Sequence, residues 1–386
     1  MPDPTDTPPE PSPPRVSWRD AAGEHVAHWV SPGASPPRRI GVADDRTRAA
    51  EAFARVRRGE ALVYAGDYQN ARQLLAAMAR RIAPRAPRAA DPAGLFRAER
   101  ETVRLEHEIL GRLLVPLGEG WTVGLRRAPD VRVACEEALG APPGGDAVLP
   151  LRDLLGIVGA HEWRRRGLPI PALGGDRIHP HYGVYAPIRG EYVDLVAAAA
   201  REWPVAGKRA LDVGTGTGVL AIVLARAGAR VTATDLEPRA VACARENVDR
   251  LGVADRVEVV RADLFPPAAV AELVVSNPPW VPAAAHGPLD RAVYDPGGAF
   301  LERLVLGIPE RLAPGGEAWL VLSDLAERLG LREPDHVERL TARAGLAIAA
   351  MREARPTHPR ARDASDPLHE ARSREVTRLF RLMLVK

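Results

Sequence analysis

A glycine-rich turn constrains the fold of this 386-residue chain more than any other feature of the sequence. Gly214-Thr-Gly-Thr-Gly218 follows a short apolar run at 209–213 and precedes a run of helical character. Glycines let a strand turn sharply into a helix and let the backbone approach a ligand closely. The free N–H groups at the start of that helix add a positive dipole end. The turn therefore predicts a strand–turn–helix unit that binds a ligand in an α/β sheet.

Strand-like and helix-like segments alternate along the second half of the chain. Short β-branched runs separated by stretches of helical length are typical of a doubly wound, mostly parallel α/β sheet. The last two runs are joined by a loop at 355–374 that is rich in Pro, His, Arg and Asp, which predicts a closing antiparallel hairpin. The predicted strands cover 209–213, 230–234, 257–260, 273–276, 318–323, 346–350 and 377–385.

The first part of the chain has a different pattern. Residues 1–15 contain seven prolines and few apolar side chains, so we expect a disordered tail there. We expect a mostly helical N-terminal domain over 16–170, which completes the substrate site, and the α/β sheet domain over 171–386. The predicted helices cover 46–58, 66–83, 92–114, 129–139 and 150–166, with one short strand at 121–125.

The composition excludes several classes of protein. The cysteines Cys135 and Cys243 are too few for a disulfide scaffold, and no run of about 18 apolar residues predicts a membrane helix. The 53 basic and 50 acidic residues leave a net charge of +3, which does not require a nucleic-acid partner. No signal peptide is visible, so a cytoplasmic location is expected. His179 and His181 lack further ligands at suitable spacing, so we expect no metal site.

Carboxylates follow the next two predicted strands. Asp235 comes 21 residues after Gly214, where a carboxylate can accept both hydroxyls of a ribose. Asp263 ends the third strand, where it can accept a hydrogen bond from an adenine amino group. The Gly-x-Gly-x-Gly spacing differs from the nicotinamide fingerprint. The candidate cofactor-binding residues are Asp212, Gly214, Thr215, Gly216, Thr217, Gly218, Asp235, Leu236, Asp263, Leu264 and Asn277.

The fourth predicted strand ends in Ser276-Asn-Pro-Pro-Trp280, at the sheet edge where ligands of such folds bind. The Asn277 side chain and the Pro278 carbonyl can each accept one N–H. Pro278 and Pro279 stiffen the loop, and Trp280 offers a flat face to a planar group. These four residues therefore form a candidate catalytic motif for a planar –NH2 group, which can be an amide, an exocyclic base amine or a guanidinium.

Together these motifs resemble those of the class I S-adenosylmethionine (SAM)-dependent methyltransferases, over roughly residues 183–386. Asn-Pro-Pro-Trp is similar to the Asn-Pro-Pro-aromatic signature of N-methyltransferases, and the likeness is closer to the small-domain branch, which includes the protein-glutamine methyltransferases. The resemblance implies a strand order of 3-2-1-4-5-7-6, SAM as cofactor and S-adenosylhomocysteine as product. Trp280 stands where the branch usually has Tyr, and the N-terminal region is longer than in that branch.

Two further segments are similar to segments of that branch. Pro187-Ile-Arg-Gly-Glu-Tyr-Val193 resembles its Pro-Arg-x-x-Glu segment, and Tyr294-Asp-Pro296 resembles its Tyr-Glu-Pro segment. A guanidinium substrate would also need a compensating carboxylate, for which Asp295, Glu191 and Glu302 are candidates. The candidate substrate-binding residues are Tyr185, Arg189, Glu191, Tyr294 and Asp295.

The sequence leaves the methyl acceptor open. The leading hypothesis is methyl transfer to a guanidinium or carboxamide nitrogen of an amino acid, a peptide or a protein. One alternative is an RNA or DNA base-amine methyltransferase, and another is a non-catalytic SAM-binding regulatory protein. The expected partner is accordingly a small-molecule, peptide or protein substrate, with nucleic acid less favoured and no membrane, and a homodimer stays open.

Overall fold

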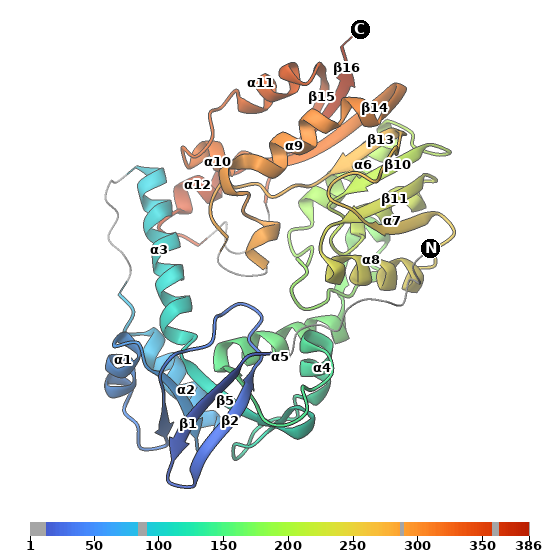
Figure 1. Cartoon of the computed structure of the whole chain (residues 1–386). Coiled ribbons are helices and arrows are strands. Elements are labelled where there is room, and N and C mark those ends of the chain that lie inside the picture. The colour runs from blue at the N-terminus through green and yellow to red at the C-terminus, as the bar shows by residue number, and fades with distance from the viewer. Residues whose placement is uncertain (1–12, 84–90, 286–288, 357–362, 386) are drawn as a thin grey trace. The chain divides into compact units, whose positions relative to one another are not determined.

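The computed structural model describes residues 13–83, 91–285, 289–356 and 363–385, in two compact units (Figure 1). Unit 1 comprises Met1–Arg85 and Glu101–His161, and unit 2 comprises Ala86–Arg100 and Glu162–Lys386. The sheet domain therefore begins a few residues earlier than the predicted 171, and it includes a short segment from the first part of the chain.

Unit 2 contains a seven-stranded sheet in the order β12-β11-β10-β13-β14-β16-β15. Neighbours from β12 to β14 run parallel, whereas β16 is antiparallel to both β14 and β15. When the strands of this sheet are numbered in chain order, the order is 3-2-1-4-5-7-6, which confirms the predicted fold and the closing hairpin. The strands are β10 (Arg209–Val213), β11 (Arg230–Asp235), β12 (Val257–Arg261), β13 (Ala271–Ser276), β14 (Leu312–Ser323), β15 (Leu346–Ala354) and β16 (Thr377–Leu384).

Helices cover both faces of this sheet. Successive strand residues point to opposite faces, so Ala210 belongs to an apolar cluster with α6, α7 and α8, while Leu211 belongs to a cluster with α9 and α11. The candidate site residues follow the carboxyl ends of the parallel strands. The helices are α6 (Glu191–Glu202), α7 (Val219–Arg226), α8 (Pro238–Arg250), α9 (Ala299–Gly307), α10 (Leu325–Arg328), α11 (His336–Arg343) and α12 (His369–Ser373); β8 (Leu168–Pro169) pairs with β9 (Arg177–Ile178).

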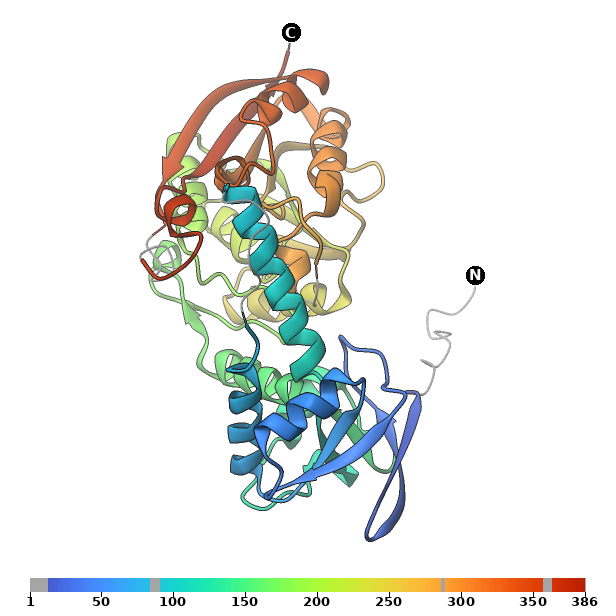
Figure 2. The same ribbon diagram turned by 90° about the vertical axis from the view of Figure 1, so that its left-hand side faces the viewer.

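Unit 1 is built around its own sheet, in the order β1-β2-β7-β5-β4-β3, with β6 beside β5. The strands β3, β4 and β5 run parallel, β7 is antiparallel to β5, and β1 and β2 form a hairpin (Figure 2). β1 also lies against β3, so the sheet curls around an apolar cluster. The elements are β1 (Arg15–Asp20), β2 (Gly23–Trp29), β3 (Ile40–Asp44), α1 (Ala49–Arg57), β4 (Ala61–Ala65), α2 (Tyr68–Ala79), α3 (Pro92–Leu110), β5 (Leu113–Gly118), β6 (Thr122–Val123), α4 (Arg132–Leu139), β7 (Ala147–Pro150) and α5 (Leu151–Arg166). The first turns of α3 and the last residues of α5 belong to unit 2.

This sheet differs from the mostly helical N-terminal domain that the sequence predicts. The predicted helices are present as α1 to α5, but most of the strands between them were not expected. The first four residues of β4 are buried, so the strand lacks the alternation of apolar and polar residues that identifies a half-exposed strand. Leu113-Leu114 continues the apolar spacing of α3 in sequence, yet that helix ends at Leu110. Of the predicted disordered tail, residues 1–12 lie outside the described residues, and β1 begins at Arg15.

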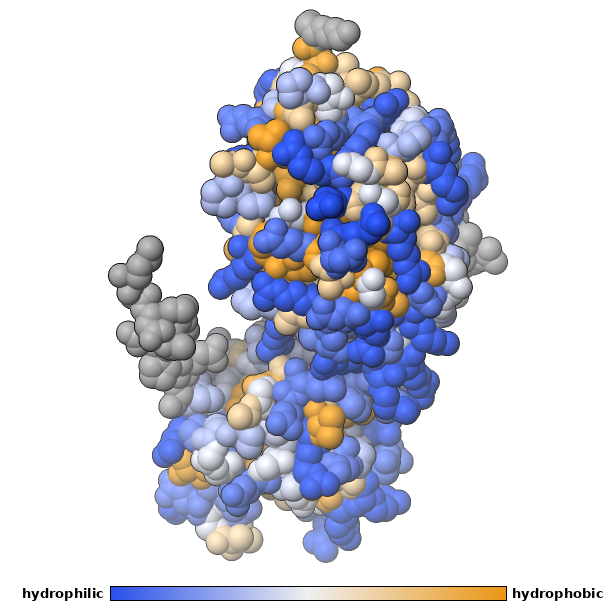
Figure 3. All heavy atoms as spheres, turned by 90° about the vertical axis from the view of Figure 1, so that its right-hand side faces the viewer, coloured by the Kyte–Doolittle hydropathy of each residue, from blue (hydrophilic) through white to orange (hydrophobic). Residues whose placement is uncertain are grey.

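The face of the molecule in Figure 3 is mostly hydrophilic, with apolar side chains in scattered spots. Within the part of the chain that the structure describes, no helix combines the length and the apolar character needed to cross a bilayer. The large apolar side chains that are exposed include Ile188 and Leu236, at 57% and 53%. Leu236 is one of the predicted cofactor-binding residues.

Candidate functional site

The glycine-rich turn connects β10 to α7 at the carboxyl edge of the unit 2 sheet. Its three glycines have positive φ angles, of 73° at Gly214, 56° at Gly216 and 82° at Gly218, a conformation that L side chains rarely adopt. A Cβ at Gly218 would also lie 3.2 Å from the Cα of Ala244 in α8. The turn thus needs glycine both for its backbone path and for its close packing on the next helix.

Asp212, the penultimate residue of β10, stabilises this turn through hydrogen bonds of its side chain. Its side chain is buried, and Oδ2 accepts hydrogen bonds from the Thr215 hydroxyl at 2.6 Å and the Ala221 N–H at 3.0 Å. The other oxygen, Oδ1, has no hydrogen-bond partner among the described residues. Burial raises the pKa of Asp212 to about 6. Asp212 therefore organises the turn and is itself held in an unfavourable environment for its charge.

A buried asparagine that is not among the predicted site residues supports the same turn. Asn247 of α8 donates from Nδ2 to the Thr217 carbonyl at 3.1 Å, and its Oδ1 accepts the His179 N–H at 2.9 Å. His181 in the same segment lies 2.6 Å from Glu246, measured from Nε2 to Oε2. The only signal for Asn247 in the sequence is a polar residue on the apolar face of a helix, which is too common to identify a functional residue.

Asp235 ends β11 and contacts the turn directly. Its Oδ2 accepts the Gly216 N–H at 3.0 Å, its Oδ1 accepts the Glu237 N–H at 3.0 Å, and burial raises its pKa. Carboxylate oxygens have further lone pairs, so ribose hydroxyls can still bind there. The exposed side chain of Leu236 follows it and offers an apolar surface to an adenine ring. This part of the site fits SAM, the cofactor that the resemblance implies.

The two predicted cofactor-binding residues after β12 differ in burial, since Leu264 is buried and Asp263 is exposed. Leu264 is buried with a φ of 64°, and its carbonyl accepts the Thr234 hydroxyl at 2.7 Å, which ties this loop to β11. Asp263 is exposed and forms an ion pair with Arg303 at 2.7 Å. Its predicted contact with an adenine amino group would therefore have to compete with Arg303.

The Asn-Pro-Pro-Trp loop begins beside the glycine-rich turn. Val213 and Ser276 are paired in register at the ends of β10 and β13, and the Ser276 hydroxyl donates to the Val213 carbonyl at 2.7 Å. Gly214 and Asn277, the residues that directly follow these two strands, are therefore neighbours at the sheet edge. The Asn277 Oδ1 accepts the indole N–H of Trp280 at 2.8 Å.

Arg189, one of the predicted substrate-binding residues, lies against this loop, and Glu191, another of them, pairs with it. The Arg189 guanidinium lies over the Trp280 ring, 4.8 Å from its centroid, and pairs with Glu191 at 2.8 Å. It also pairs at 2.9 Å with Glu375, a buried residue that no sequence motif singles out. Burial raises the pKa of Tyr185, and the nearby charge of Arg189 opposes this rise. Arg189, Glu191 and Glu375 thus form one ionic group beside the loop, in which both carboxylates are buried.

Tyr294 and Asp295 are next to the loop but are occupied by other contacts. Tyr294 pairs with Val281 in a β-bridge, and the Arg100 guanidinium lies 4.0 Å from its ring centroid. The two carboxylate oxygens of Asp295 accept the N–H groups of Phe300 and Leu301 at 2.9 and 3.0 Å. Asp295 thus caps the start of α9, so the structure gives it a role different from the predicted substrate contact.

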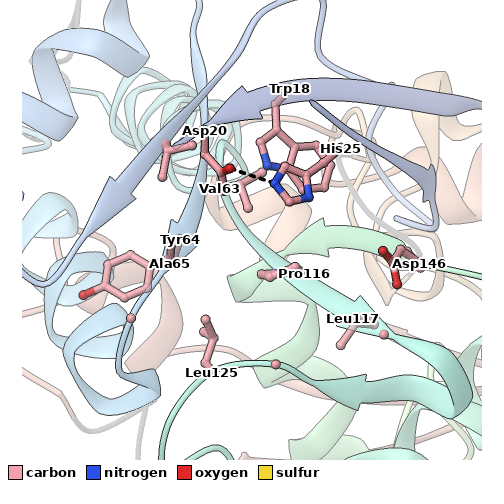
Figure 4. Close-up of a pocket in the computed structure, with 15 residues that line it drawn as sticks. Trp18, Asp20, His25, Val63, Tyr64, Ala65, Pro116, Leu117, Leu125 and Asp146 are labelled. Atoms are coloured by element: carbon pink, nitrogen blue, oxygen red, sulfur yellow. Dashed lines mark ion pairs between the residues drawn. The ribbon is translucent and has the colours of Figure 1, made fainter. Parts of the chain in front are cut away.

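Unit 1 has a pocket of about 360 Å³ of its own (Figure 4). Trp18 stacks on His25, with ring centroids 5.2 Å apart, and His25 pairs with Asp20 at 2.9 Å on the β1–β2 hairpin. Apolar side chains of β4 and β5, such as Val63 and Leu117, line the other side. None of the predicted site residues lines this pocket.

Comparison with known proteins places unit 2 in a family. The methyltransferase small domain model matches residues 194–331. The chain is 39% identical to the release factor glutamine methyltransferase of Cereibacter sphaeroides over 175 residues, 41% of this chain and 59% of that protein. It is 33% identical to the enzyme of the same name from Bordetella pertussis over 220 residues, 50% of this chain and 80% of that protein. The match thus spans less than two thirds of the first relative and four fifths of the second. Among solved structures, a ribosomal protein L11 methylase from Lactobacillus delbrueckii subsp. bulgaricus aligns with a TM-score of 0.38 at 17% identity, covering 55% of this chain and 87% of that one.

Proposed function

Because this chain belongs to the class I SAM-dependent methyltransferases that carry a methyltransferase small domain, we propose that it methylates the side-chain carboxamide of a glutamine in a protein. Family membership confirms SAM as the cofactor that the sequence predicted. The relatives named above are glutamine methyltransferases of release factors, which supports a protein substrate and makes a release factor the first acceptor to test.

The proposed acceptor site is formed by the loop after β13. Asn277 Oδ1 already accepts the Trp280 N–H, and a carbonyl oxygen has a second lone pair for one substrate N–H. The Pro278 carbonyl accepts the other substrate N–H, and the two prolines keep both acceptors in place. Bound SAM supplies an electrophilic methyl group on a sulfonium. Holding the nitrogen in line with that methyl group is therefore the main task of the protein, and orientation contributes roughly 7–11 kcal/mol in well-aligned reactions.

The charges around the loop favour a neutral carboxamide over a guanidinium. A cationic acceptor would meet the positive charge of the sulfonium. It would therefore need a carboxylate that is available. The three carboxylates that the sequence suggested have other partners: Glu191 pairs with Arg189, Asp295 caps α9, and Glu302 pairs with Arg343.

The hydrogen bond between Trp280 and Asn277 is the observation that carries this proposal, since it places the amide oxygen at the sheet edge beside the glycine-rich turn. The test is incubation of the full chain with labelled SAM and release factors, followed by mass analysis of the modified residue. Arginine, peptides and tRNA serve as parallel acceptors. A methyl group on a glutamine side chain is expected, whereas transfer only to arginine or to a nucleobase would contradict the proposal.

A matched pair of variants tests the role of the loop. Asn277→Ala should reduce turnover by about 10²–10³-fold, as expected when one preorganised contact to the reacting group is lost. It should leave SAM binding measurable by calorimetry. Asn70→Ala, which removes an asparagine of unit 1 that bonds to Asp45, should leave turnover near that of the wild type. Equal turnover in the two variants would refute the assignment of Asn277.

A further inference from the structure

We propose that Trp280 is a positioning residue for Asn277, and that Arg189 and Glu375 hold its indole in place. The proposal rests on the proposed function, because it explains how the acceptor site keeps its geometry. It assigns a task to the one residue of the motif that departs from the usual tyrosine, and to a buried glutamate far along the chain.

The indole N–H determines which way the Asn277 amide faces. An asparagine amide has an oxygen that accepts and an NH2 group that donates, and the two ends have nearly the same shape. The indole N–H is a donor only, so at 2.8 Å it stabilises the amide orientation with Oδ1 toward the ring. Rotating the amide by half a turn would place two donors against each other. A phenyl ring at this position could not distinguish the two orientations.

The face of the indole is held by an arginine that is itself immobilised. Arg189 lies 4.8 Å from the ring centroid, an arrangement in which the cation is attracted to the π-face. Its guanidinium pairs with Glu191 at the start of α6 and with Glu375 just before β16. Glu375 is 1% exposed and also accepts the hydroxyl of Ser323 at the end of β14. The arginine is thus held between a helix start and two strand ends.

The backbone of Trp280 is held from another direction. Its carbonyl accepts a hydrogen bond from the Arg332 guanidinium at 2.9 Å, and its N–H donates to the Val293 carbonyl at 3.1 Å. Arg332 is 8% exposed, so burial lowers its pKa and water competes little for this bond. The ring edge, the ring face and the main chain of Trp280 therefore all have fixed partners, which is what a group that positions a catalytic amide requires.

Trp280→Phe is the direct test, because it removes the N–H and keeps an aromatic face under Arg189. Losing one hydrogen bond that orients the reacting group should lower kcat by about tenfold, with KM for the acceptor and the affinity for SAM changed less than about twofold. Glu375→Gln should lower kcat by about threefold by loosening the cation over the ring. Trp203→Phe, which alters a tryptophan whose ring packs at an angle of 60° against that of Trp319, is the matched control and should leave kcat near the wild-type value.

A second measurement does not depend on turnover. Trp280 should show an indole N–H that exchanges with solvent at least about tenfold more slowly than that of Trp163, which is 47% exposed. In Asn277→Ala this protection should be lost. A wild-type kcat in Trp280→Phe, or equal exchange at Trp280 in the wild type and in Asn277→Ala, would overturn the proposal. If the wild type methylates no acceptor, the proposed function fails, and the exchange measurement still decides whether Trp280 orients Asn277.

Discussion

Asp212 should lower the stability of unit 2 at neutral pH relative to acidic pH, and replacing it by asparagine should remove this contribution. The side chain is 1% exposed, and burial raises its pKa from the ordinary 3.8 to about 6. The folded state therefore retains the proton in a pH range where the unfolded state releases it. Unfolding releases a proton in that range, so stability falls as the pH rises from about 3.8 to about 6 and then stays constant.

The size of the effect follows from the shift. A rise of about two pKa units corresponds to about 3 kcal/mol when the group is fully ionised in both states. Part of this penalty is already present at moderately acid pH, so the change between about pH 4.5 and pH 8 is about 2 kcal/mol. Asp212→Asn cannot ionise. The difference in free energy of unfolding between Asp212→Asn and the wild type should therefore be more favourable to the variant by about 2 kcal/mol at pH 8 than at pH 4.5.

The assay is amide hydrogen exchange of β10 and β13 without cofactor at the two pH values, because these central strands report the opening of unit 2. If asparagine makes poorer hydrogen bonds than aspartate, the free energy of unfolding of the variant changes by the same amount at both pH values. This change therefore cancels when the two pH values are compared. Asp255→Asn, at a side chain that is 75% exposed, is the control and should show the same difference from the wild type at both values. If the difference for Asp212→Asn changes by less than about 0.5 kcal/mol, the carboxylate is hydrated and the reasoning fails.

Two further predictions concern cofactor binding. Gly218→Ala should destabilise the protein by about 1–3 kcal/mol and weaken SAM binding, because it combines a positive φ with a close contact to Ala244, as thermal unfolding and calorimetry can measure. Gly252→Ala has a φ of 66° but no neighbour within 4 Å of the added Cβ, so it should show a smaller loss, and equal losses would contradict the packing argument. Asp235→Ala should weaken SAM binding by about tenfold or more through lost charge-assisted hydrogen bonds, and an unchanged calorimetric affinity would remove Asp235 from the site.

The sequence predicts the unit 2 sheet well because local signals coincide there. The glycine-rich turn, the carboxylate of Asp235 and the prolines after Asn277 each follow a strand directly, and parallel strands bring these ends to one edge. Unit 1 lacks such signals. The strand Ala61–Ala65 is short and buried, so its pattern does not distinguish a buried strand from part of a helix.

The partners of the charged residues could not be predicted from the sequence, since they are set by contacts between distant segments. Arg189 and Glu375 are 186 positions apart, and Trp280 and Arg332 are 52 apart. Asp295 matches a substrate-binding carboxylate by its place after the loop, yet both of its oxygens accept hydrogen bonds from α9.

These distant pairings also determine which acceptor charge the site favours. Asn277 and Pro278, which we propose hold the –NH2 group of the acceptor, are compatible with a carboxamide, a base amine or a guanidinium. The choice depends on whether a carboxylate remains to balance a cation, and Glu191 is already paired with Arg189. Since a guanidinium would meet the positive charge of the sulfonium, and Asp295 and Glu302 also have other partners, we expect a neutral acceptor. In the proposed function, the local motif thus sets the geometry of the acceptor, and the long-range ion pairs leave none of the suggested carboxylates without a partner to balance a cation.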